Sequence, residues 1–282
     1  MEAALKKGDS IITSYRDHCH QITRGDSGDN VMAELLGKAT GSSGGKGGSM
    51  HLYYPKNNFY GGNGIVGAQV PLGAGVAFAH KYKGDGGVCV AAYGDGAANQ
   101  GQIFEAANMA KLWGLPLIFL IENNQYGMGT STARGSAADE FYKRGDYIPG
   151  LWLDGMDTLA VKKGFEFALD YVRTNQTPLF VEASTYRYHG HSMSDPGISY
   201  RSRDEVKAVQ EQRDCIDQTK NRLLEAGWIT PAELKAITKE TRAKVDGHVK
   251  FAKSSPVPEL SELDTNIYTE YYTPRPTRFG LD

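Results

Sequence analysis

Residues 88–96 read VCVAAYGDG, and residues 117–124 read LIFLIENN. Each stretch begins with a short apolar run of strand length, and between them apolar residues recur at helical spacing from Ile103 to Leu112. A strand, a crossover helix and a second strand make a βαβ unit, in which the two strands are parallel. The sequence therefore predicts an α/β fold in which a parallel sheet is flanked by helices.

The same pattern recurs towards the C-terminus. Residues 158–173 have the apolar spacing of an amphipathic helix, and PLFVEAS at 178–184 reads as a third strand. Two further helices are predicted by capping-box patterns, Ser202-x-x-Glu205 and Thr230-Pro-x-Glu233. We expect one domain over residues 1–282, with a core at about 11–200, and a helical extension and an extended, proline-containing tail at 201–282.

Composition excludes several classes of protein. The 282 residues carry 31 Lys and Arg against 33 Asp and Glu, so the chain lacks the basic excess that nucleic-acid binding requires. No run approaches the roughly 20 apolar residues of a membrane helix. The three cysteines are far apart, which predicts neither a disulfide framework nor a zinc cluster and favours a reducing compartment. The first residues resemble neither a secretory signal nor a transit peptide, so any targeting sequence is expected to have been removed.

Glycine is the unusual residue, with 34 in the chain. Residues 37–49, GKATGSSGGKGGS, are too rich in glycine for a helix or a central strand, so we predict a loop, for which a flexible linker is the simplest interpretation. Residues 61–75, GGNGIVGAQVPLGAG, predict a tight turn that leads into a closely packed helix.

Polar residues follow both strands of the βαβ unit. Asp95 lies between two glycines after the first strand, and Asn123 and Asn124 end the second. Because parallel strands present their carboxyl ends at one edge of a sheet, these oxygens can meet around a hard cation such as Mg²⁺. The glycines let backbone amides approach a phosphate, and the helix that begins near Asn99 directs its positive end there. The sequence therefore predicts a Mg²⁺-bridged diphosphate at this edge.

Other phosphate-binding motifs fit less well. A Gly-Asp-Gly triplet alone is a common turn, so the prediction depends on the second strand and its asparagines. Gly45-Lys46 lacks the flanking residues of a Walker loop. The G-x-G-x-x-G at 62–67 follows no convincing strand and has no acidic residue about twenty positions later, which makes dinucleotide binding a distant alternative.

Five segments together resemble the α subunits of eukaryotic pyruvate dehydrogenase components, the thiamine diphosphate-dependent first enzymes of the pyruvate dehydrogenase complexes. They are FYGGNGIVGAQVPLGAG at 59–75, YGDGAANQGQIFEA at 93–106, IENNQYGMGTS at 121–131, YKRGDYIPGL at 142–151 and TYRYHGHSMSDPG at 185–197. The resemblance covers about residues 11–250. Branched-chain 2-oxo acid and acetoin dehydrogenases share the GDG-to-NN frame and are the alternatives, while the last segment favours the pyruvate type.

The resemblance implies the site residues and the fold, a thiamine diphosphate-binding domain of the pyrophosphate type. Mg²⁺ would be held by Asp95, Asn124 and the Tyr126 carbonyl. His191 would be the catalytic residue, close to the diphosphate and the reacting thiazolium, where it can hydrogen-bond developing charge. The other cofactor contacts implied are Gly96 and Ala97 at the diphosphate, Gly64 and Val66 by main chain, Tyr15 and Arg16 at the phosphate end, and Met128 against the bent cofactor.

The resemblance also implies partners and regulation. No second α/β domain is seen that could supply the activating glutamate, so a β subunit would complete the site in an α2β2 heterotetramer in the mitochondrial matrix. The implied oxidoreductase reaction decarboxylates pyruvate, the product of glycolysis, and acetylates the lipoyl domain of the acetyltransferase core, which leads to acetyl-CoA biosynthesis. A dedicated kinase, opposed by a phosphatase, would phosphorylate Ser131, Ser192 and Ser199. At Ser192, beside His191, the added negative charge would repel the cofactor's phosphates and disorder the loop.

Two alternatives stay open from the residues alone. A non-catalytic regulatory or scaffold paralogue could retain the fold, although it would have no need of Asp95, Asn124 and His191 together. Each histidine also has a non-functional interpretation. His191 would then be a polar loop residue, and His189, His18 and His20 would be surface or packing groups.

Overall fold

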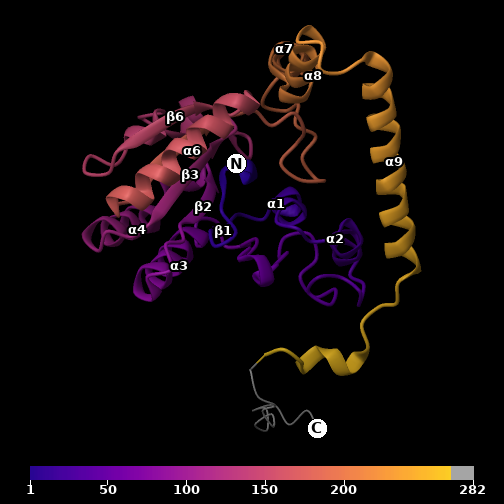
Figure 1. Ribbon diagram of the computed structural model, residues 1–282, viewed down its shortest axis with the longest axis horizontal. Helices are drawn as coiled ribbons and strands as arrows, with labels where there is room; N and C mark the ends of the chain where they lie inside the picture. Colours follow the sequence, from indigo (N-terminus) through magenta and orange to yellow (C-terminus); the bar gives the residue numbers. More distant parts are fainter. Residues whose placement is uncertain (268–282) are drawn as a thin grey trace.

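The computed structural model describes residues 1–267, and its centre is a five-stranded sheet in the order β1-β2-β3-β7-β6 with every pair parallel (Figure 1). The sheet strands are β1 (Ser10–Ile12), β2 (Cys89–Gly94), β3 (Leu117–Asn123), β6 (Gly150–Asp154) and β7 (Leu179–Ser184). A small antiparallel hairpin joins β4 (Tyr126–Gly127) and β5 (Thr130–Ser131). The predicted parallel sheet flanked by helices is confirmed.

Three helices cover the sheet, α3 (Gln69–Lys83) and α4 (Gly101–Leu112) on one face and α6 (Thr158–Asn175) on the other (Figure 1). The chain passes from β1 through α3, β2 and α4 to β3 in one direction across the sheet, whereas β6-α6-β7 returns in the opposite direction. Right-handed crossovers running in opposite directions place their helices on opposite faces. The strand order therefore accounts for the three layers.

Both faces of the central strands are apolar because both are covered. On the α3–α4 face, Ala91, Tyr93 and Phe119 pack with small helix residues such as Ala77 and Ala107. On the α6 face, the alternate strand residues pack against Phe165, Leu169 and Val172. The continuous apolar runs that identify β2 and β3 in the sequence are the expression of this double burial.

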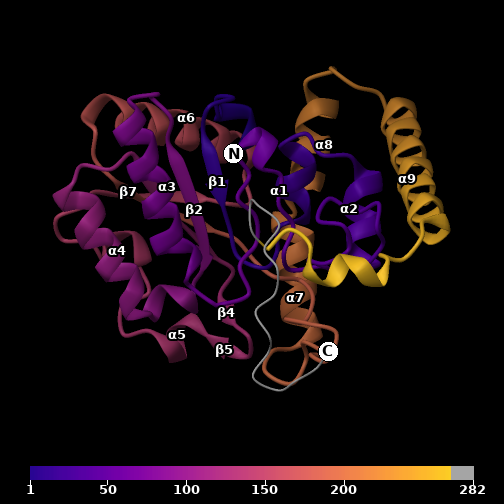
Figure 2. The ribbon, with the colours of Figure 1, turned by 90° about the horizontal axis from the view of Figure 1, so that it is seen from below.

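Except for the short helix that follows the hairpin, the remaining helices lie to one side of the sheet (Figure 2). Near the N-terminus are α1 (His18–Thr23) and α2 (Gly28–Leu35), and the four-residue α5 (Thr132–Gly135) follows the hairpin. The C-terminal extension contains α7 (Arg203–Arg213), α8 (Cys215–Glu225) and α9 (Pro231–Ser254), of which α9 packs against α2. That residues 1–282 form a single domain stays a prediction.

The helical extension agrees with the prediction at one helix start, agrees in part at another, and contains one further helix. The capping box at Thr230 is present in full, with Pro231 at the start of α9. At Ser202 only half of the predicted box exists, because the Ser202 hydroxyl accepts from the Glu205 amide while the Glu205 carboxylate turns elsewhere. Helix α8 was not predicted, and its N-cap Asp214 accepts from two amides of the first turn.

The glycine-rich segment at 37–49 is not the flexible linker that its composition suggests. The buried carboxylate of Glu34 accepts hydrogen bonds from the amides of Ser43, Gly45, Gly47 and Gly48, at 2.7–3.1 Å. A carboxylate enclosed by successive amides is a strong, charge-assisted arrangement. The loop is therefore folded around the last turn of α2.

The tail after Ser254 is only partly as expected. A 3₁₀ turn at Leu260–Asp264 interrupts the extended chain, and Pro274 and Pro276 lie outside the described residues. No helix within residues 1–267 has the length and apolar character needed to cross a membrane.

Candidate functional site

A cavity of about 300 Å³ lies at the carboxyl edge of the sheet. The segments that follow β1, β2, β3 and β7 all contribute to its wall, through Arg16, Asp95, Asn124 and Arg187. The strands end at one level, because Gly94 pairs with Glu122 and Asn123 pairs with Ser184. This is the edge at which open parallel sheets bind ligands.

Ten of the residues implied by the resemblance line this cavity. They are Tyr15, Arg16, Val66, Asp95, Gly96, Ala97, Asn124, Tyr126, Met128 and His191. Gly64 is not among the lining residues, and a Cβ there would face the His51 ring at 3.1 Å. The structure thus brings together residues that are up to 176 positions apart in the chain.

The cavity contains buried oxygens that no group in residues 1–267 satisfies. One carboxylate oxygen of Asp95 (Oδ1), the side-chain oxygen of Asn124 and that of Gln69 are buried and make no hydrogen bond there. Asp95 itself is only 3 % exposed. Buried polar groups are nearly always paired in native proteins, and unpaired ones point to an ion, a water or a ligand. An anionic oxygen beside an amide oxygen suits a hard cation.

The two asparagines that end β3 have different roles. The Asn123 amide nitrogen donates to Glu182 at 2.7 Å, and its side-chain oxygen accepts from the Gln125 amide at 3.1 Å. Asn123 is therefore committed to holding the start of the following turn. Asn124 keeps its oxygen free, which agrees with its implied role as the ligand of the pair.

The turn after β3 is fixed in an unusual backbone conformation. Gln125 and Met128 have φ angles of 73° and 55°, in the left-handed region that few non-glycine residues adopt. Gly96 and Gly127 approach so closely that a Cβ on either would lie 3.2–3.3 Å from the Cα of the other. The Arg187 guanidinium ties the turn to the exit of β7 by donating to the carbonyls of Tyr126 at 2.8 Å and Met128 at 2.6 Å.

His191 lies where the segments after β1 and β7 meet. Its carbonyl accepts from the Arg16 guanidinium, and its ring contacts the edge of Tyr15 with centroids 5.8 Å apart. Burial and the neighbouring charges of Arg16 and Arg187 lower the pKa of His191, against an opposing effect of Asp195. The imidazole is thus kept neutral near pH 7, able to donate from one nitrogen and accept at the other.

The environment of Asp95 has opposing effects on the ionisation of its carboxyl. Burial raises the pKa of its carboxyl, while the amides of Asp95 and Asn124 and the charge of Arg187 oppose that rise. The isolated carboxylate is consequently under-stabilised, which is the state that a bound cation would relieve.

The segment 187–201 is organised by two residues that sequence reasoning missed. Asp195 accepts from the amides of His191 and Gly197 and from the Tyr200 hydroxyl, at 2.7–2.8 Å, and its pKa falls to about 2, chiefly through the His191 amide. Arg201 is buried and donates to the carbonyls of Arg187, His189 and Gly197. Asp195 lies within the quoted TYRYHGHSMSDPG segment, so its presence there was the available signal; Arg201 gave none.

The serines implied as phosphorylation sites lie in accessible segments. Ser192 and Ser199 are exposed, and Ser131 is half-buried in β5. The Ser192 hydroxyl lies 3.0 Å from the Ser194 hydroxyl. His189 contributes its carbonyl rather than its ring, and His18 and His20 contact Ser49 and Glu122 respectively. Within the part of the chain described, no three His, Cys, Asp or Glu side chains gather as a metal cluster.

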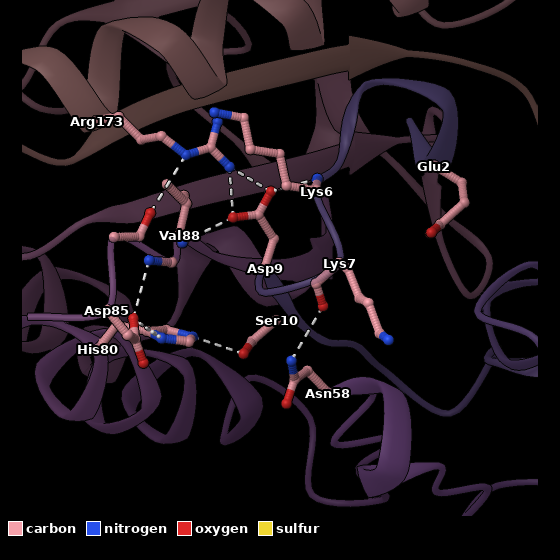
Figure 3. A network of polar contacts seen from close by, with 12 residues as sticks. Glu2, Lys6, Lys7, Asp9, Ser10, Asn58, His80, Asp85, Val88 and Arg173 are labelled. Carbon is pink, nitrogen blue, oxygen red and sulfur yellow. Dashed lines mark hydrogen bonds and ion pairs between the residues drawn. The ribbon is translucent and has the colours of Figure 1, made fainter. Parts of the chain in front are cut away.

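A second polar cluster lies at the opposite, amino end of β1 and β2 (Figure 3). Ser10 Oγ is 2.7 Å from His80 Nε2, and His80 Nδ1 is 2.8 Å from Asp85. The order of the three groups resembles a hydrolase triad. Ser10 is completely buried, however, so its hydroxyl has no access to a substrate. The cluster is structural.

The fold and the cavity together define an α/β protein that binds its ligand outside the carboxyl ends of a parallel sheet. The chain belongs to the dehydrogenase E1 component family, whose model matches residues 1–261. It is 54 % identical over 270 residues, 96 % of this chain and 69 % of the relative, to the mitochondrial pyruvate dehydrogenase E1 component subunit alpha-1 of Oryza sativa subsp. japonica. The testis-specific mitochondrial subunit alpha of Homo sapiens is 53 % identical over 95 % of this chain and 69 % of its own length. The Pisum sativum subunit alpha is 52 % identical over the whole of this chain and 70 % of its own length.

Proposed function

We propose that this chain is the α subunit of a pyruvate dehydrogenase component that acts in the mitochondrial matrix. Relatives with this name are 52–54 % identical to it over nearly its whole length. The reaction is the thiamine diphosphate-dependent oxidative decarboxylation of pyruvate with acetylation of a lipoyl group. The observation that supports this best is the pair of unsatisfied buried oxygens, on Asp95 and Asn124, at the exits of two neighbouring strands.

The residues at the cavity fit a Mg²⁺-bridged diphosphate. Asp95, Asn124 and the Tyr126 carbonyl would hold the metal. That carbonyl has a second lone pair, so the Arg187 contact leaves one available. Gly96 and Ala97 bring backbone amides to the diphosphate, and Arg16 and Tyr15 reach its phosphate end. Val66 and Met128 lie at the partly exposed rim, where they would contact the organic part of the cofactor, and Gly64, outside the lining, would contribute by main chain.

The cofactor, when bound, supplies the carbanion chemistry of the reaction. His191 presents a neutral imidazole to the reacting centre, where it donates a hydrogen bond to charge that develops on the substrate. Arg16 holds the main chain of His191, and Asp195 holds its amide, so the ring is carried by a fixed backbone. This is positioning of a donor before the reaction begins.

The chain carries half of an active site. A β subunit completes it in an α2β2 heterotetramer and contributes the glutamate that activates the cofactor, and the assembled site faces the lipoyl domain of the acetyltransferase core. The exposed loop around Ser192 and Ser199, together with Ser131, is the substrate of a regulatory kinase and phosphatase. A phosphate on Ser192 places nearly two negative charges beside the cofactor's own phosphates.

Calorimetry tests the shared site. Thiamine diphosphate and Mg²⁺ are titrated into this chain alone and into its mixture with a pyruvate dehydrogenase β subunit. We expect tight binding only in the mixture, followed by turnover of pyruvate in preference to branched-chain 2-oxo acids. Asp95→Ala should abolish binding, because it removes the one charged side chain proposed as a ligand of the metal.

The matched control is Asp170→Ala, which removes an exposed carboxylate from α6. It should bind as the unmodified chain does. Absence of binding in the unmodified mixture would contradict the proposal and favour a scaffold role.

A further inference from the structure

Glu205 is the third residue of α7, and its carboxylate is used in an unexpected way. At the same position of α9, Glu233 accepts from the amide and hydroxyl of Thr230 at 2.7–2.8 Å and closes a capping box. Glu205 gives up that role. One of its carboxylate oxygens instead accepts from the hydroxyls of Tyr126 at 3.0 Å and Tyr186 at 2.7 Å. Helix α7 thus forgoes half of its cap to reach two tyrosines.

The two tyrosines belong to the segments that form the cofactor edge. Tyr126 lies in the turn after β3, and its own carbonyl is the proposed metal ligand. Tyr186 directly precedes Arg187. Their rings meet edge to face with centroids 6.3 Å apart, and the Arg201 guanidinium lies 5.2 Å from the centre of each. The two rings are therefore contacted both by the Arg201 cation and, through their hydroxyls, by the Glu205 carboxylate.

These contacts form a closed ring of hydrogen bonds that begins and ends at Tyr126. The Tyr126 side chain is bonded to Glu205, Glu205 to Tyr186, and the next residue, Arg187, to the main-chain carbonyl of Tyr126. The turn contains two residues at left-handed φ, so its backbone conformation has to be maintained by the surrounding structure. Removing the Glu205 carboxylate deletes the hydrogen bonds to both tyrosine hydroxyls and leaves only the main-chain contact of Arg187 in this ring.

We infer that Glu205 is a positioning residue for the metal-binding turn, acting through the tyrosine hydroxyls and without touching the metal or the cofactor. This inference rests on the proposed function, because it assumes that the Tyr126 carbonyl binds Mg²⁺. It assigns to the C-terminal extension a part in the affinity of the site for its metal. Mutation of groups that orient the metal ligands commonly changes metal affinity by about 10- to 100-fold.

The test measures Mg²⁺ affinity of the assembled heterotetramer by calorimetry at saturating thiamine diphosphate. Glu205→Ala should raise the Mg²⁺ dissociation constant about tenfold. Glu205→Gln keeps an acceptor oxygen at the same reach and should fall between Glu205→Ala and the unmodified enzyme. Glu233→Ala, which removes the equivalent helix residue from α9, should leave the dissociation constant unchanged.

The tyrosines provide the specific readout. In a chain carrying both Tyr126→Phe and Tyr186→Phe, adding Glu205→Ala should cause no further loss of Mg²⁺ affinity, whereas a general effect on α7 would still appear. If Glu205→Ala does not assemble, Tyr126→Phe alone, which deletes one hydroxyl, should still weaken Mg²⁺ binding.

An unchanged Mg²⁺ constant in assembled Glu205→Ala, or an equal loss in Glu233→Ala, overturns the inference. Failure of the unmodified heterotetramer to bind Mg²⁺ and thiamine diphosphate would overturn the proposed function instead, so the two failures are distinguishable.

Discussion

The two ends of the central strands each bury a carboxylate, and the two carboxylates are treated in opposite ways. At the amino end, Asp9 is 1 % exposed and accepts from the amides of Lys6 and Val88 and from the guanidinium of Arg173 (Figure 3). At the carboxyl end, Asp95 is 3 % exposed and one of its oxygens has no partner within residues 1–267.

Structural and functional burial of a carboxylate differ in whether its hydrogen-bonding positions are filled. A buried charge is stable only when it is paired and its remaining hydrogen-bonding positions are filled, as they are at Asp9. Asp95 shows the opposite condition, because burial there raises the pKa of the carboxyl and one of its oxygens has no partner among the described residues 1–267. The completed cluster stabilises the fold, and the incomplete one awaits a ligand.

The largest expected effect is at the completed cluster. Asp9→Asn keeps the shape of the side chain but leaves the Arg173 guanidinium, which is mostly buried, without its counter-charge. We expect the free energy of unfolding to fall by about 3–5 kcal/mol. Urea denaturation of the isolated chain measures it. Glu211→Gln, which breaks the exposed Lys207–Glu211 pair, is the control and should change stability by less than about 0.5 kcal/mol.

A smaller effect is expected at the buried hydroxyl of the same end. Ser10→Ala removes the hydrogen bond to His80 Nε2 and should lower the free energy of unfolding by about 1 kcal/mol.

Because Ser10 is buried, an organophosphorus reagent that modifies active serines should leave it unlabelled in the folded chain. Labelling of Ser10 there, detected by mass spectrometry, would show that the amino end of the sheet is also a reactive site.

The sequence was most informative for the central strands, because burial of both their faces produces continuous apolar runs. The apolar runs of β2 and β3 and the polar residues directly after them predicted both the parallel sheet and the edge at which Asp95 and Asn124 meet. Strand β1 was missed because three residues are too few to show a period, and β6 because it is an edge strand with Trp152 and Gly150 exposed.

Contacts between distant segments could not be predicted in the same way. Nothing local marks Glu34 as the anion at the centre of the glycine-rich loop, since the amides that bind it lie 9 to 14 residues further along the chain. The Ser202–Glu205 pattern predicted a helix start correctly but the carboxylate's partners incorrectly, because Tyr126 is 79 residues away. Spacing predicts elements, whereas such partners depend on how the elements pack.

A directional effect on ionisation is expected at the carboxyl end. The pKa of His191 lies below its usual value because of burial and then the charge of Arg16. Since the folded chain disfavours the imidazolium, the segment around His191 should lose stability as the pH falls below about 6.5, the unfolded value, and be unaffected above it. Arg16→Gln should raise the pKa of His191, measured by NMR of the ring protons. Lys239→Gln, on the distant α9, should not; an equal rise there would exclude the local charge as the cause.

The smallest expected change in stability is the most direct test of the contrast. Asp95→Asn is the same substitution as Asp9→Asn at an equally buried position, yet it removes a charge that lacks a close cation. In the absence of cofactor, the free energy of unfolding should stay the same or rise, because a neutral amide is less costly to bury than an under-paired carboxylate. The unmodified heterotetramer should gain about 2.7 kcal/mol with cofactor and Mg²⁺ at 100 times their dissociation constant, and the Asp95→Asn heterotetramer should gain almost nothing. A loss of several kcal/mol in the cofactor-free chain would mean that Asp95, like Asp9, is a structural carboxylate, and the distinction between the two ends of the sheet would fail.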